Sequence, residues 1–410
     1  MPLTHRGHVV AALGSAQTLA WASTYYLPAM LAAPMARELG TSPPTVFAAF
    51  SSALVVSALV GPWSGRAIDR YGGRPMLMLT SLLFAAGLAG LGSVDSVWAL
   101  FAAWALLGAA MGCGLYEAAF AALVRLYGHD SRNSITGITL IAGFASTVGW
   151  PLSAWMESRY GWRGACYGWA ALHLVVGLPL NAWLPRPSAS PQIGSAASPP
   201  SGVAATTAEP TPRRPGVTTA LLAFVFAATW FVSTAMATHL PDMLQGMGAS
   251  LAAAVAVGAL IGPAQVAGRL LEFGVLRRMH PLLSARLAAL GHPVGVIVLL
   301  VAGPALAPLF AVMHGAGNGI MTIAKGTLPL VLFGTQGYGA RQGWLSMPTR
   351  AAQALSPFLF GLALARWGTG ALWLSAGLGL AAFIALMALP AMQPVRTAPD
   401  AEALSSSKKA

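Results

Sequence analysis

Residues 61–75 read GPWSGRAIDRYGGRP, a short basic stretch that joins two long apolar runs. Charge-free residues precede it from Leu39 to Gly65 and follow it from Pro75 to Val94. A helix of about 20 apolar residues spans the hydrocarbon core of a membrane. Both flanking runs are long enough, so the stretch predicts a tight turn between two membrane-spanning helices.

Composition identifies lipid as the solvent for much of the chain. Apolar residues make up 56% of the sequence and charged residues 8%, whereas a soluble domain carries about a quarter charged residues. Further long charge-free runs are Val9–Met35, Pro215–Pro241, Met243–Gly268, Leu287–Ala324 and Trp367–Val395. These runs indicate an integral membrane protein rather than a soluble enzyme. The two cysteines, Cys113 and Cys166, both lie in apolar segments and imply no disulfide framework.

The net charge of +12 is interpreted as a topology signal and not as a sign of nucleic-acid binding. If the N-terminus is cytoplasmic and twelve spans follow, 17 Lys and Arg residues fall on the cytoplasmic side and four fall outside. This excess is the positive-inside bias, so we expect a multi-pass protein of the cytoplasmic (inner) membrane with both termini in the cytoplasm. The cytoplasmic set is Arg6, Arg66, Arg70, Arg74, Arg125, Arg132, Arg186, Arg213, Arg214, Arg269, Arg277, Arg278, Arg286, Arg341, Arg396, Lys408 and Lys409. The outer set is Arg37, Arg159, Arg163 and Arg366.

The hydropathy pattern predicts twelve helices in two sets of six. Their approximate ranges are 9–33, 44–67, 75–95, 98–125, 134–157, 164–184, 218–240, 249–272, 284–303, 306–333, 342–365 and 368–390. Residues 185–217 are rich in Pro, Ser, Ala and Thr and are predicted to be a flexible cytoplasmic linker. We therefore expect bundles over 1–184 and 218–392, followed by a cytoplasmic tail over 393–410.

The two halves of the chain repeat three short patterns in the same order. Gly65-Arg66-x-x-Asp69 matches Gly268-Arg269-x-x-Glu272, and Pro28-Ala-Met-Leu31 matches Pro241-Asp-Met-Leu244. The third match is Gly112-x-Gly114 with Gly317-x-Gly319. Internal repeats of this length are typical of transporter folds built from duplicated bundles.

The core of the opening stretch, Gly65-x-x-x-Asp69-Arg70-x-Gly72-x-Arg74, resembles the loop between the second and third transmembrane helices of the major facilitator superfamily. The resemblance implies an all-α integral membrane protein with two pseudo-symmetric six-helix bundles. It also implies a latch that holds the halves together when the cytoplasmic side is closed. A carboxylate at the end of a helix can cap the terminus of a neighbouring helix. The expected latch residues are Gly65, Asp69, Arg70, Gly72, Arg74, Arg269 and Glu272.

Three ionisable residues lie inside predicted spans, where charge is costly and usually faces a cavity. Glu117, Lys325 and Arg350 are each eight or nine residues from a predicted cytoplasmic helix end. At about 1.5 Å per residue, this places all three roughly 12–14 Å deep. In the rocking motion of the family, helices four and five approach helices ten and eleven, so Glu117 is expected to meet Lys325 or Arg350 when the cavity opens outward.

Polar residues at helical spacing extend this site into a substrate pathway. Three stripes are predicted, one on each of helices one, ten and eleven. The resemblance places helices one, four, seven and ten around the pathway, which adds two residues of helix seven. The expected pathway residues are Gln17, Trp21, Tyr25, Glu117, Trp230, Thr234, His314, Asn318, Thr322, Lys325, Arg350 and Gln353. His173 and His292 are isolated and are predicted to be packed helix residues.

Two cations at one depth favour an anionic substrate, because arginine binds a carboxylate with a planar fork. We expect a secondary active transporter of a small organic anion, with alternating access and proton coupling or exchange. Glu117 would be either the coupling acid or a salt-bridge partner, and purely structural ion pairing is the plainer alternative. The paired cations also suggest a looser resemblance to the monocarboxylate and oxalate–formate branches, although Gln17 to Trp21 reads QTLAW and lacks their signature.

Other function classes stay open at this point. An exporter of amphipathic drugs, or of another small neutral or inorganic solute, would use an aromatic pocket of Trp21, Tyr25, Tyr116, Trp150 and Trp230. A non-transporting membrane sensor or scaffold is the alternative of a different class. No G-x-x-x-x-G-K-[ST] loop occurs, so the chain is not expected to hydrolyse ATP. We expect no enzyme activity, no cofactor, no metal and no nucleic-acid partner. The expected partners are the bilayer, a small molecule and a proton, and two six-helix halves should function as a monomer.

The topology is testable with reporter fusions placed after Pro185 and after Ala410. Both fusions are expected to report the cytoplasm, because the basic residues concentrate on that side of the predicted spans. Paired alkaline phosphatase and green fluorescent protein reporters measure the two sides independently. A periplasmic signal from either position would rule out the twelve-span arrangement.

Overall fold

The computed structural model describes residues 3–185, 212 and 214–389. Most of the predicted linker, 185–217, and the predicted tail, 393–410, lie outside these residues. Helices of the first half are α1 (Leu3–Ala22), α2 (Leu27–Glu38), α3 (Pro43–Tyr71), α4 (Gly73–Gly92), α5 (Val97–Gly114), α6 (Tyr116–Tyr127), α7 (Arg132–Ala142), α8 (Ala145–Leu172) and α9 (Leu178–Ala182). Those of the second half are α10 (Pro215–Gly246), α11 (Leu251–Gly274), α12 (Pro281–Ala302), α13 (Ala307–Phe333), α14 (Tyr338–Trp367) and α15 (Ala371–Ala388).

Short 3-10 and π segments connect some of these helices, and the described residues contain no strand. The 3-10 segments are η1 (Gly128–Ser131), η3 (Leu276–Arg278), η4 (Gly303–Leu306) and η5 (Gly368–Gly370). The π segment η2 (His173–Gly177) lies between α8 and α9.

The helices form the twelve predicted spans. Seven described helical stretches are long and apolar enough to cross a membrane, and three of them, of 86, 53 and 51 residues, must cross more than once. In the first of these, α8 reverses direction at Gly161, whose φ of +68° favours glycine. The predicted first span, which is divided into α1 and α2, is not among these seven stretches. The all-α fold of two six-helix bundles is confirmed.

Three spans that the hydropathy pattern predicts as continuous helices are broken in the structure. The first span breaks between α1 and α2, the fourth at Leu115, and the fifth between α7 and α8. In the first break, the hydroxyl of Thr24 donates to the carbonyl oxygen of Ala20, and Pro28 occupies the first turn of α2. A side-chain hydroxyl that occupies a backbone carbonyl competes with the helical N–H group for it, and a proline disfavours helical geometry in the residue before it. Both effects favour a helix end. All three breaks are in the first half.

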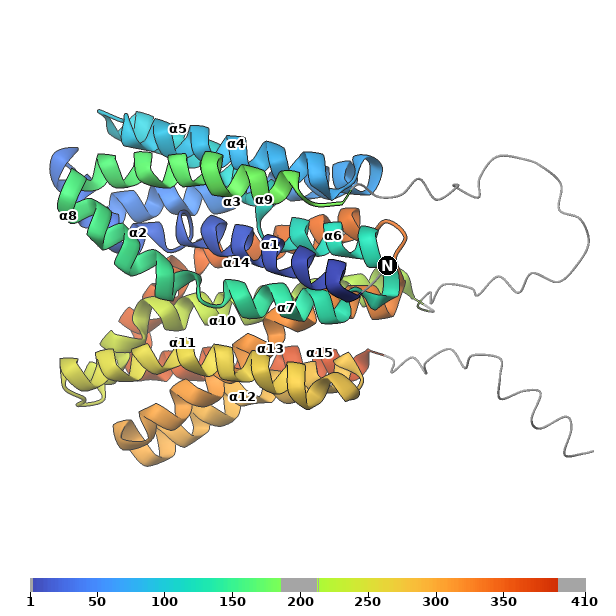
Figure 1. Ribbon diagram of the computed structural model, residues 1–410. Helices are drawn as coiled ribbons and strands as arrows, with labels where there is room; N and C mark the ends of the chain where they lie inside the picture. The colour runs from blue at the N-terminus through green and yellow to red at the C-terminus, as the bar shows by residue number, and fades with distance from the viewer. Residues whose placement is uncertain (1–2, 186–211, 213, 390–410) are drawn as a thin grey trace, which may run out of the picture.

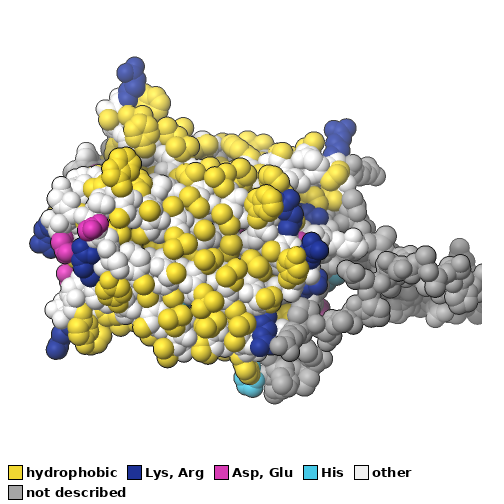
Figure 2. Space-filling model, turned by 90° about the horizontal axis from the view of Figure 1, so that it is seen from above, with side chains coloured by type: hydrophobic (Ala, Val, Ile, Leu, Met, Phe, Trp, Pro, Cys, Tyr) yellow, Lys and Arg dark blue, Asp and Glu magenta, His cyan; other side chains and the backbone are white. Residues whose placement is uncertain are grey.

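The two halves pack against each other: most of the blue-to-green helices lie in the upper part of Figure 1 and most of the yellow-to-red helices in the lower part, while α14 runs among the helices of the first half against α3. α1 and α10 begin, and α9 and α15 end, at one end of the molecule, which we call the linker end (Figure 1). The opposite end is called the far end. Hydrophobic side chains cover the middle of the face in Figure 2, and charged side chains gather toward the two ends. This distribution suits a protein that crosses a bilayer.

A seam of glycines joins the halves where α3 packs along α14. Gly61 and Gly65 of α3 face Gly343 and Gly339 of α14. A Cβ atom on Gly343 would lie 2.5 Å from the carbonyl oxygen of Gly61, and one on Gly65 would overlap the carbonyl group of Gly339. Both helices thus use a small-xxx-small spacing, which lets two backbones approach closely within a membrane.

Gly65→Val is expected to separate α3 from α14 and to destabilise the protein by about 1–3 kcal/mol, the usual cost of overpacking. The melting temperature of the purified protein in detergent measures the effect. Gly258→Val is the matched control, because a Cβ atom on Gly258 of α11 meets no atom within 4 Å. Equal melting temperatures for the two variants would show that the seam does not hold the halves together.

Candidate functional site

Glu117 lies between two buried cations of the opposite half. Its Oε1 atom is 2.5 Å from Lys325 Nζ, and its Oε2 atom is 3.3 Å from Arg350 Nη2. The side chains of Lys325 and Arg350 are 5% and 3% exposed, and that of Glu117 is 12% exposed. The ion pair predicted between Glu117 and one of these cations is confirmed, and it includes both. It connects α6 to α13 and α14 across the boundary between the halves.

The break in the fourth span positions the Glu117 carboxylate. α5 ends at Gly114, Leu115 is extended, and Glu117 therefore occupies the first turn of α6. The N-terminus of a helix carries a partial positive charge that stabilises an acidic side chain. The amide of Gln17 donates a hydrogen bond of 2.7 Å to the carbonyl oxygen of Gly114, which the break leaves without a helical partner.

A cavity of about 160 Å³ opens beside Glu117 between the two halves. Its walls come from α1, the α1–α2 connection, α6 and α7 in the first half and from α10, α11, α13 and α14 in the second. The lining residues are Trp21, Tyr25, Tyr26, Tyr116, Glu117, Phe120, Ala142, Trp230, Ser233, Ala237, Gln265, Arg269, Asn318, Thr322, Lys325, Arg350 and Gln353. We call this space the central cavity.

Aromatic rings hold the cations at the wall of the central cavity. Lys325 Nζ lies 4.8 Å from the centre of the Trp230 ring, and the Arg350 guanidinium carbon lies 5.8 Å from that of Trp21. Both distances fall within the range of cation–π attraction. Gln353 accepts a hydrogen bond of 3.4 Å from Arg350 and donates one of 3.2 Å to the Tyr25 hydroxyl. The N–H groups of Lys325 and Arg350 are thus directed toward the central cavity and Glu117.

Arg269 adds a third cation to the central cavity. The sequence pattern predicted Arg269 as a latch residue only. It is 6% exposed and donates a hydrogen bond of 3.0 Å to the carbonyl oxygen of Thr139 near the end of α7. Its Nε atom is buried without a hydrogen-bond partner among the described residues. Gln265, four residues earlier on α11, lines the same cavity. The spacing of these two polar residues by one helical turn is the signal that could have revealed the third cation.

Most of the predicted pathway residues come together at the central cavity, and three do not line it. Gln17 binds the Gly114 carbonyl, as described above. Thr234 does not line the cavity, whereas the preceding residue Ser233 does, because the rotation of α10 turns Ser233 inward. His314 lines a smaller cavity inside the second half. The aromatic residue Trp150 also lies elsewhere, 43% exposed and edge-on to Tyr26.

Asp69 holds the two halves together at the linker end. Its carboxylate accepts hydrogen bonds of 2.9 Å and 2.8 Å from the backbone N–H groups of Gly339 and Ala340. These groups belong to the first turn of α14, so Asp69 caps a helix of the opposite half. The capping contact predicted for this carboxylate is confirmed. Among the described residues no ion pair joins Asp69 to Arg70 or Arg74, and the Arg70 guanidinium lies over the Tyr71 ring instead.

The second copy of the motif, Arg269 and Glu272, contacts α7 near both of its ends. Glu272 of α11 accepts a hydrogen bond of 2.9 Å from Arg132, the first residue of α7. Arg269 binds the carbonyl of Thr139 near the other end of that helix. The two copies of the motif therefore make equivalent contacts, since each carboxylate binds the start of a helix in the other half. Asp69 binds backbone N–H groups of α14, and Glu272 binds the guanidinium of Arg132 in α7.

Comparisons with known proteins identify the same architecture. Residues 13–324 match the sequence profile of the Major Facilitator Superfamily. The fold is similar to the human organic anion transporter MFSD10, with 17% identity, a TM-score of 0.69, and coverage of 94% of this chain and 100% of that one. It is similar to the E. coli fucose:proton symporter FucP, with 13% identity, a TM-score of 0.70, and coverage of 92% and 97%.

A third similar structure is the proton:xylose symporter XylE, solved with 6-bromo-6-deoxy-D-glucose, with 13% identity, a TM-score of 0.71, and coverage of 95% and 97%. No curated protein sequence matches the chain. At these identities the likeness to solved structures shows the fold alone.

Asp69→Asn is expected to leave the fold intact and to loosen the linker end, because an amide accepts with one oxygen where the carboxylate uses two. Ala237→Cys introduces a reporter thiol into the central cavity, and both native cysteines are buried. A membrane-impermeant maleimide added from the linker side should label this thiol several-fold faster in the Asp69→Asn background. Arg70→Gln is the control. Equal labelling rates in all backgrounds would show that Asp69 does not hold the linker end closed and that its charge only helps to set the membrane topology.

Proposed function

The chain belongs to the Major Facilitator Superfamily, a family of non-enzymatic carriers, and from this membership and its cavity we propose that it transports a small organic anion coupled to a proton. Membership identifies it as a multi-pass membrane protein and a secondary transporter. The single observation that carries the substrate class is the charge of the central cavity. The anionic substrate, the proton and their coupling are the proposed part.

The charges of the central cavity favour an anion. Arg269, Lys325 and Arg350 face one carboxylate, Glu117, so three positive charges and one negative charge leave a formal excess of +2. Charge buried at this depth is costly unless it is compensated. A substrate carboxylate would supply the missing negative charge, and the guanidinium groups offer it paired donors.

Glu117 is placed to couple this anion to a proton. In its ionised form it occupies Lys325 and Arg350 with both carboxylate oxygens. Protonation of Glu117 weakens both ion pairs and raises the formal excess charge by one, so an anion then binds the same cations more tightly. By linkage, the anion strengthens protonation of Glu117 by the same factor. Proton and anion would therefore enter the cavity together.

A second small space on the other side of Glu117 supports this assignment. It has a volume of about 10 Å³ and is lined by Glu117, Ser64, Ser346 and glycines of the α3–α14 seam. The hydroxyl of Ser64 is buried here beside the Cys113 thiol. This volume is close to the minimum for one water molecule, which would find a carboxylate and a hydroxyl there. Glu117 would thus reach water on the side facing the linker end as well as in the central cavity.

We also propose that the linker end is cytoplasmic and that the bundles over 1–184 and 218–392 rock against each other as a monomer. The basic residues of the linker-end turns support this orientation. Asp69, Glu117 and Glu272 then join the halves on the cytoplasmic side of the cavity. Breaking these contacts in turn would expose the cavity to the cytoplasm.

Transport of a neutral or amphipathic solute is the second candidate, and the aromatic lining favours it. Trp21, Tyr25, Tyr116 and Trp230 of the predicted aromatic pocket all face the central cavity, with Tyr26 in addition. Such a solute would stack on these rings without using the cations. Its binding would therefore be insensitive to loss of Arg350 or Lys325.

A thermal-shift screen of the purified protein separates the two candidates. Small carboxylates should raise the melting temperature in a concentration-dependent way, because a ligand that binds only the folded state stabilises it. The shift should increase as the pH is lowered toward protonation of Glu117 and should vanish in Arg350→Gln. A shift with lipophilic cations or neutral sugars, and none with carboxylates or phosphate, would overturn the anion proposal.

Glu117→Gln and Arg350→Gln are each expected to impair transport of the identified anion strongly. Removing one partner of a buried ion pair leaves an uncompensated charge and costs about 3–5 kcal/mol. The double variant should cost less than the sum of the single variants, because the two side chains interact directly. Transport rates in reconstituted vesicles measure this cycle. A Glu117→Gln protein with a normal rate and a normal pH dependence would exclude Glu117 from both gating and proton coupling.

A further inference from the structure

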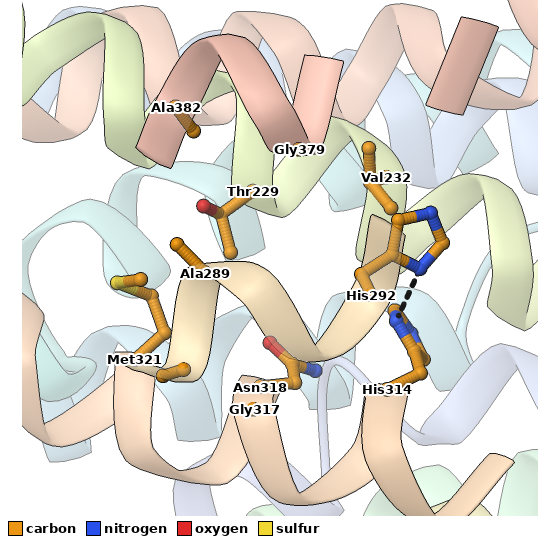
Figure 3. Close-up of a pocket in the computed structure, with 11 residues that line it drawn as sticks. Thr229, Val232, Ala289, His292, His314, Gly317, Asn318, Met321, Gly379 and Ala382 are labelled. Atoms are coloured by element: carbon orange, nitrogen blue, oxygen red, sulfur yellow. Dashed lines mark hydrogen bonds between the residues drawn. The ribbon is translucent and has the colours of Figure 1, made fainter. Parts of the chain in front are cut away.

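Two histidines form a hydrogen-bonded pair inside the second half, away from the ion pairs of Glu117. His292 of α12 and His314 of α13 approach through their Nδ1 atoms at 3.0 Å (Figure 3). The two residues are 8% and 4% exposed. His292 is therefore not an isolated packed residue as the sequence pattern predicted. Its partner comes from a neighbouring helix that is 22 residues away in the chain.

The hydrogen-bond network determines which nitrogens carry protons in the neutral pair. The hydroxyl of Ser375 donates to the carbonyl oxygen of Leu372 at 2.8 Å, so it accepts the 3.0 Å hydrogen bond from His292 Nε2. His292 Nδ1 then has no proton and accepts from His314 Nδ1–H. Two nitrogens of the pair are then unprotonated, His292 Nδ1 and His314 Nε2, and only His314 Nε2 is left without a hydrogen bond inside the pair.

A small cavity lies beside the histidine pair. His314 Nε2 has no hydrogen-bond partner among the described residues and is not among their buried unpartnered atoms. His292 and His314 line a cavity of about 30 Å³ between α10, α12, α13 and α15 (Figure 3). This volume holds about one water molecule. The pair thus lines a space from which water would deliver a proton to His314 Nε2.

Asn318 connects this space to the central cavity. It follows His314 by one helical turn on α13, and it lines both cavities. Its amide nitrogen donates a hydrogen bond of 2.8 Å to the hydroxyl of Ser233, which also faces the central cavity. A polar side chain shared by two cavities gives a proton a route between them.

Among the described residues that line the small cavity, only the two histidines are acids or bases. The other residues that line the small cavity are neutral on all four helices: Thr229, Val232, Ala288, Ala289, Gly317, Asn318, Met321, Gly379 and Ala382. The Phe310 ring stacks on His314 with centres 5.8 Å apart and an angle of 9°. A charged imidazole would gain cation–π stabilisation from this ring.

We propose that the His292–His314 pair is a second proton-binding site of the transporter, reached from the central cavity past Asn318. The proton adds to His314 Nε2, and His314 becomes an imidazolium that still donates its Nδ1–H to His292. No hydrogen bond of the pair breaks in this step. A second proton would have to add to His292 Nδ1 and would place two N–H groups head to head, so the pair accepts one proton only.

This site shares no hydrogen bond with Glu117, because its helices all belong to the second half and none of its hydrogen bonds crosses to the first. A proton held there adds positive charge on the face of α13 that also carries Lys325. The extra charge would attract an anion into the central cavity without loosening any contact between the halves. Glu117 would control the joining of the halves, and the histidine pair would adjust the potential of the cavity.

Nitrogen-15 NMR of the full-length protein, labelled at its eight histidines and reconstituted in lipid nanodiscs, tests the proposal directly. At high pH, one imidazole should carry its proton on Nε2 and another on Nδ1, with scalar coupling across one N–H···N hydrogen bond. On acidification, one member of this coupled pair should gain a second N–H and the other should stay neutral. These signatures come from the wild-type protein and do not depend on any variant being folded.

Variants then assign the signals. His314→Gln should remove the coupled pair and should lower the acid titration of the purified protein by one proton. His173→Gln is the matched control, because His173 is also buried and bound to a serine, Ser23, but lies in the first half. Glu117→Gln should retain the coupled histidine pair and its uptake of one proton, which separates this site from the proposed coupling acid. If both imidazoles stay neutral down to the lowest pH at which the protein is folded, or if both become charged, the proposal is wrong.

Discussion

A carboxylate at mid-membrane depth is stable only where positive charge reaches it, and this requirement organises the structure around Glu117. The break at Leu115 gives the carboxylate the N-terminus of α6, and the opposite half supplies Lys325 and Arg350. The halves must therefore approach closely on one side of the cavity for the charges to meet. The glycine seam between α3 and α14 permits that approach. Charge compensation and close backbone packing thus depend on each other.

The internal repeat has become asymmetric where function would require it. Both copies of the latch motif place a carboxylate at the start of a helix in the opposite half, but Asp69 binds backbone N–H groups and Glu272 binds the Arg132 guanidinium. The second copy also sends Arg269 into the central cavity, whereas Arg66 in the first copy lies over the Trp63 ring. All the span breaks lie in the first half, and the histidine pair lies in the second. One half thus supplies the acid and the other the cations.

The polar groups of the membrane interior divide into two sets with different mechanical consequences. The ion pairs of Glu117 cross between the halves, so any change in their charge alters the stability of the closed linker end. The bonds of His292 and His314 stay within one bundle, so a change in their charge breaks no contact between the bundles and acts on the central cavity through the electric field. Asn318 lines both cavities and lies between the two sets of polar groups.

The sequence alone determined the fold class, because a bilayer forces each apolar run of about 20 residues into a helix. It also placed Glu117, Lys325 and Arg350 at one depth, since the rise per residue of a helix is fixed. Rotation of each helix about its axis was decided by tertiary packing. That rotation turns Ser233 rather than Thr234 toward the central cavity and brings Arg269 to its wall.

The break beside Glu117 and the pairing of His292 with His314 also required the tertiary structure. Both depend on contacts between helices: Gln17 of α1 binds the carbonyl of Gly114 in α5, and His292 of α12 meets His314 on the next helix, α13. A hydrophobic pattern records which residues are apolar and at what depth they lie. It does not record which neighbouring helix each polar group will face, because that choice is made by the packing of all twelve spans together.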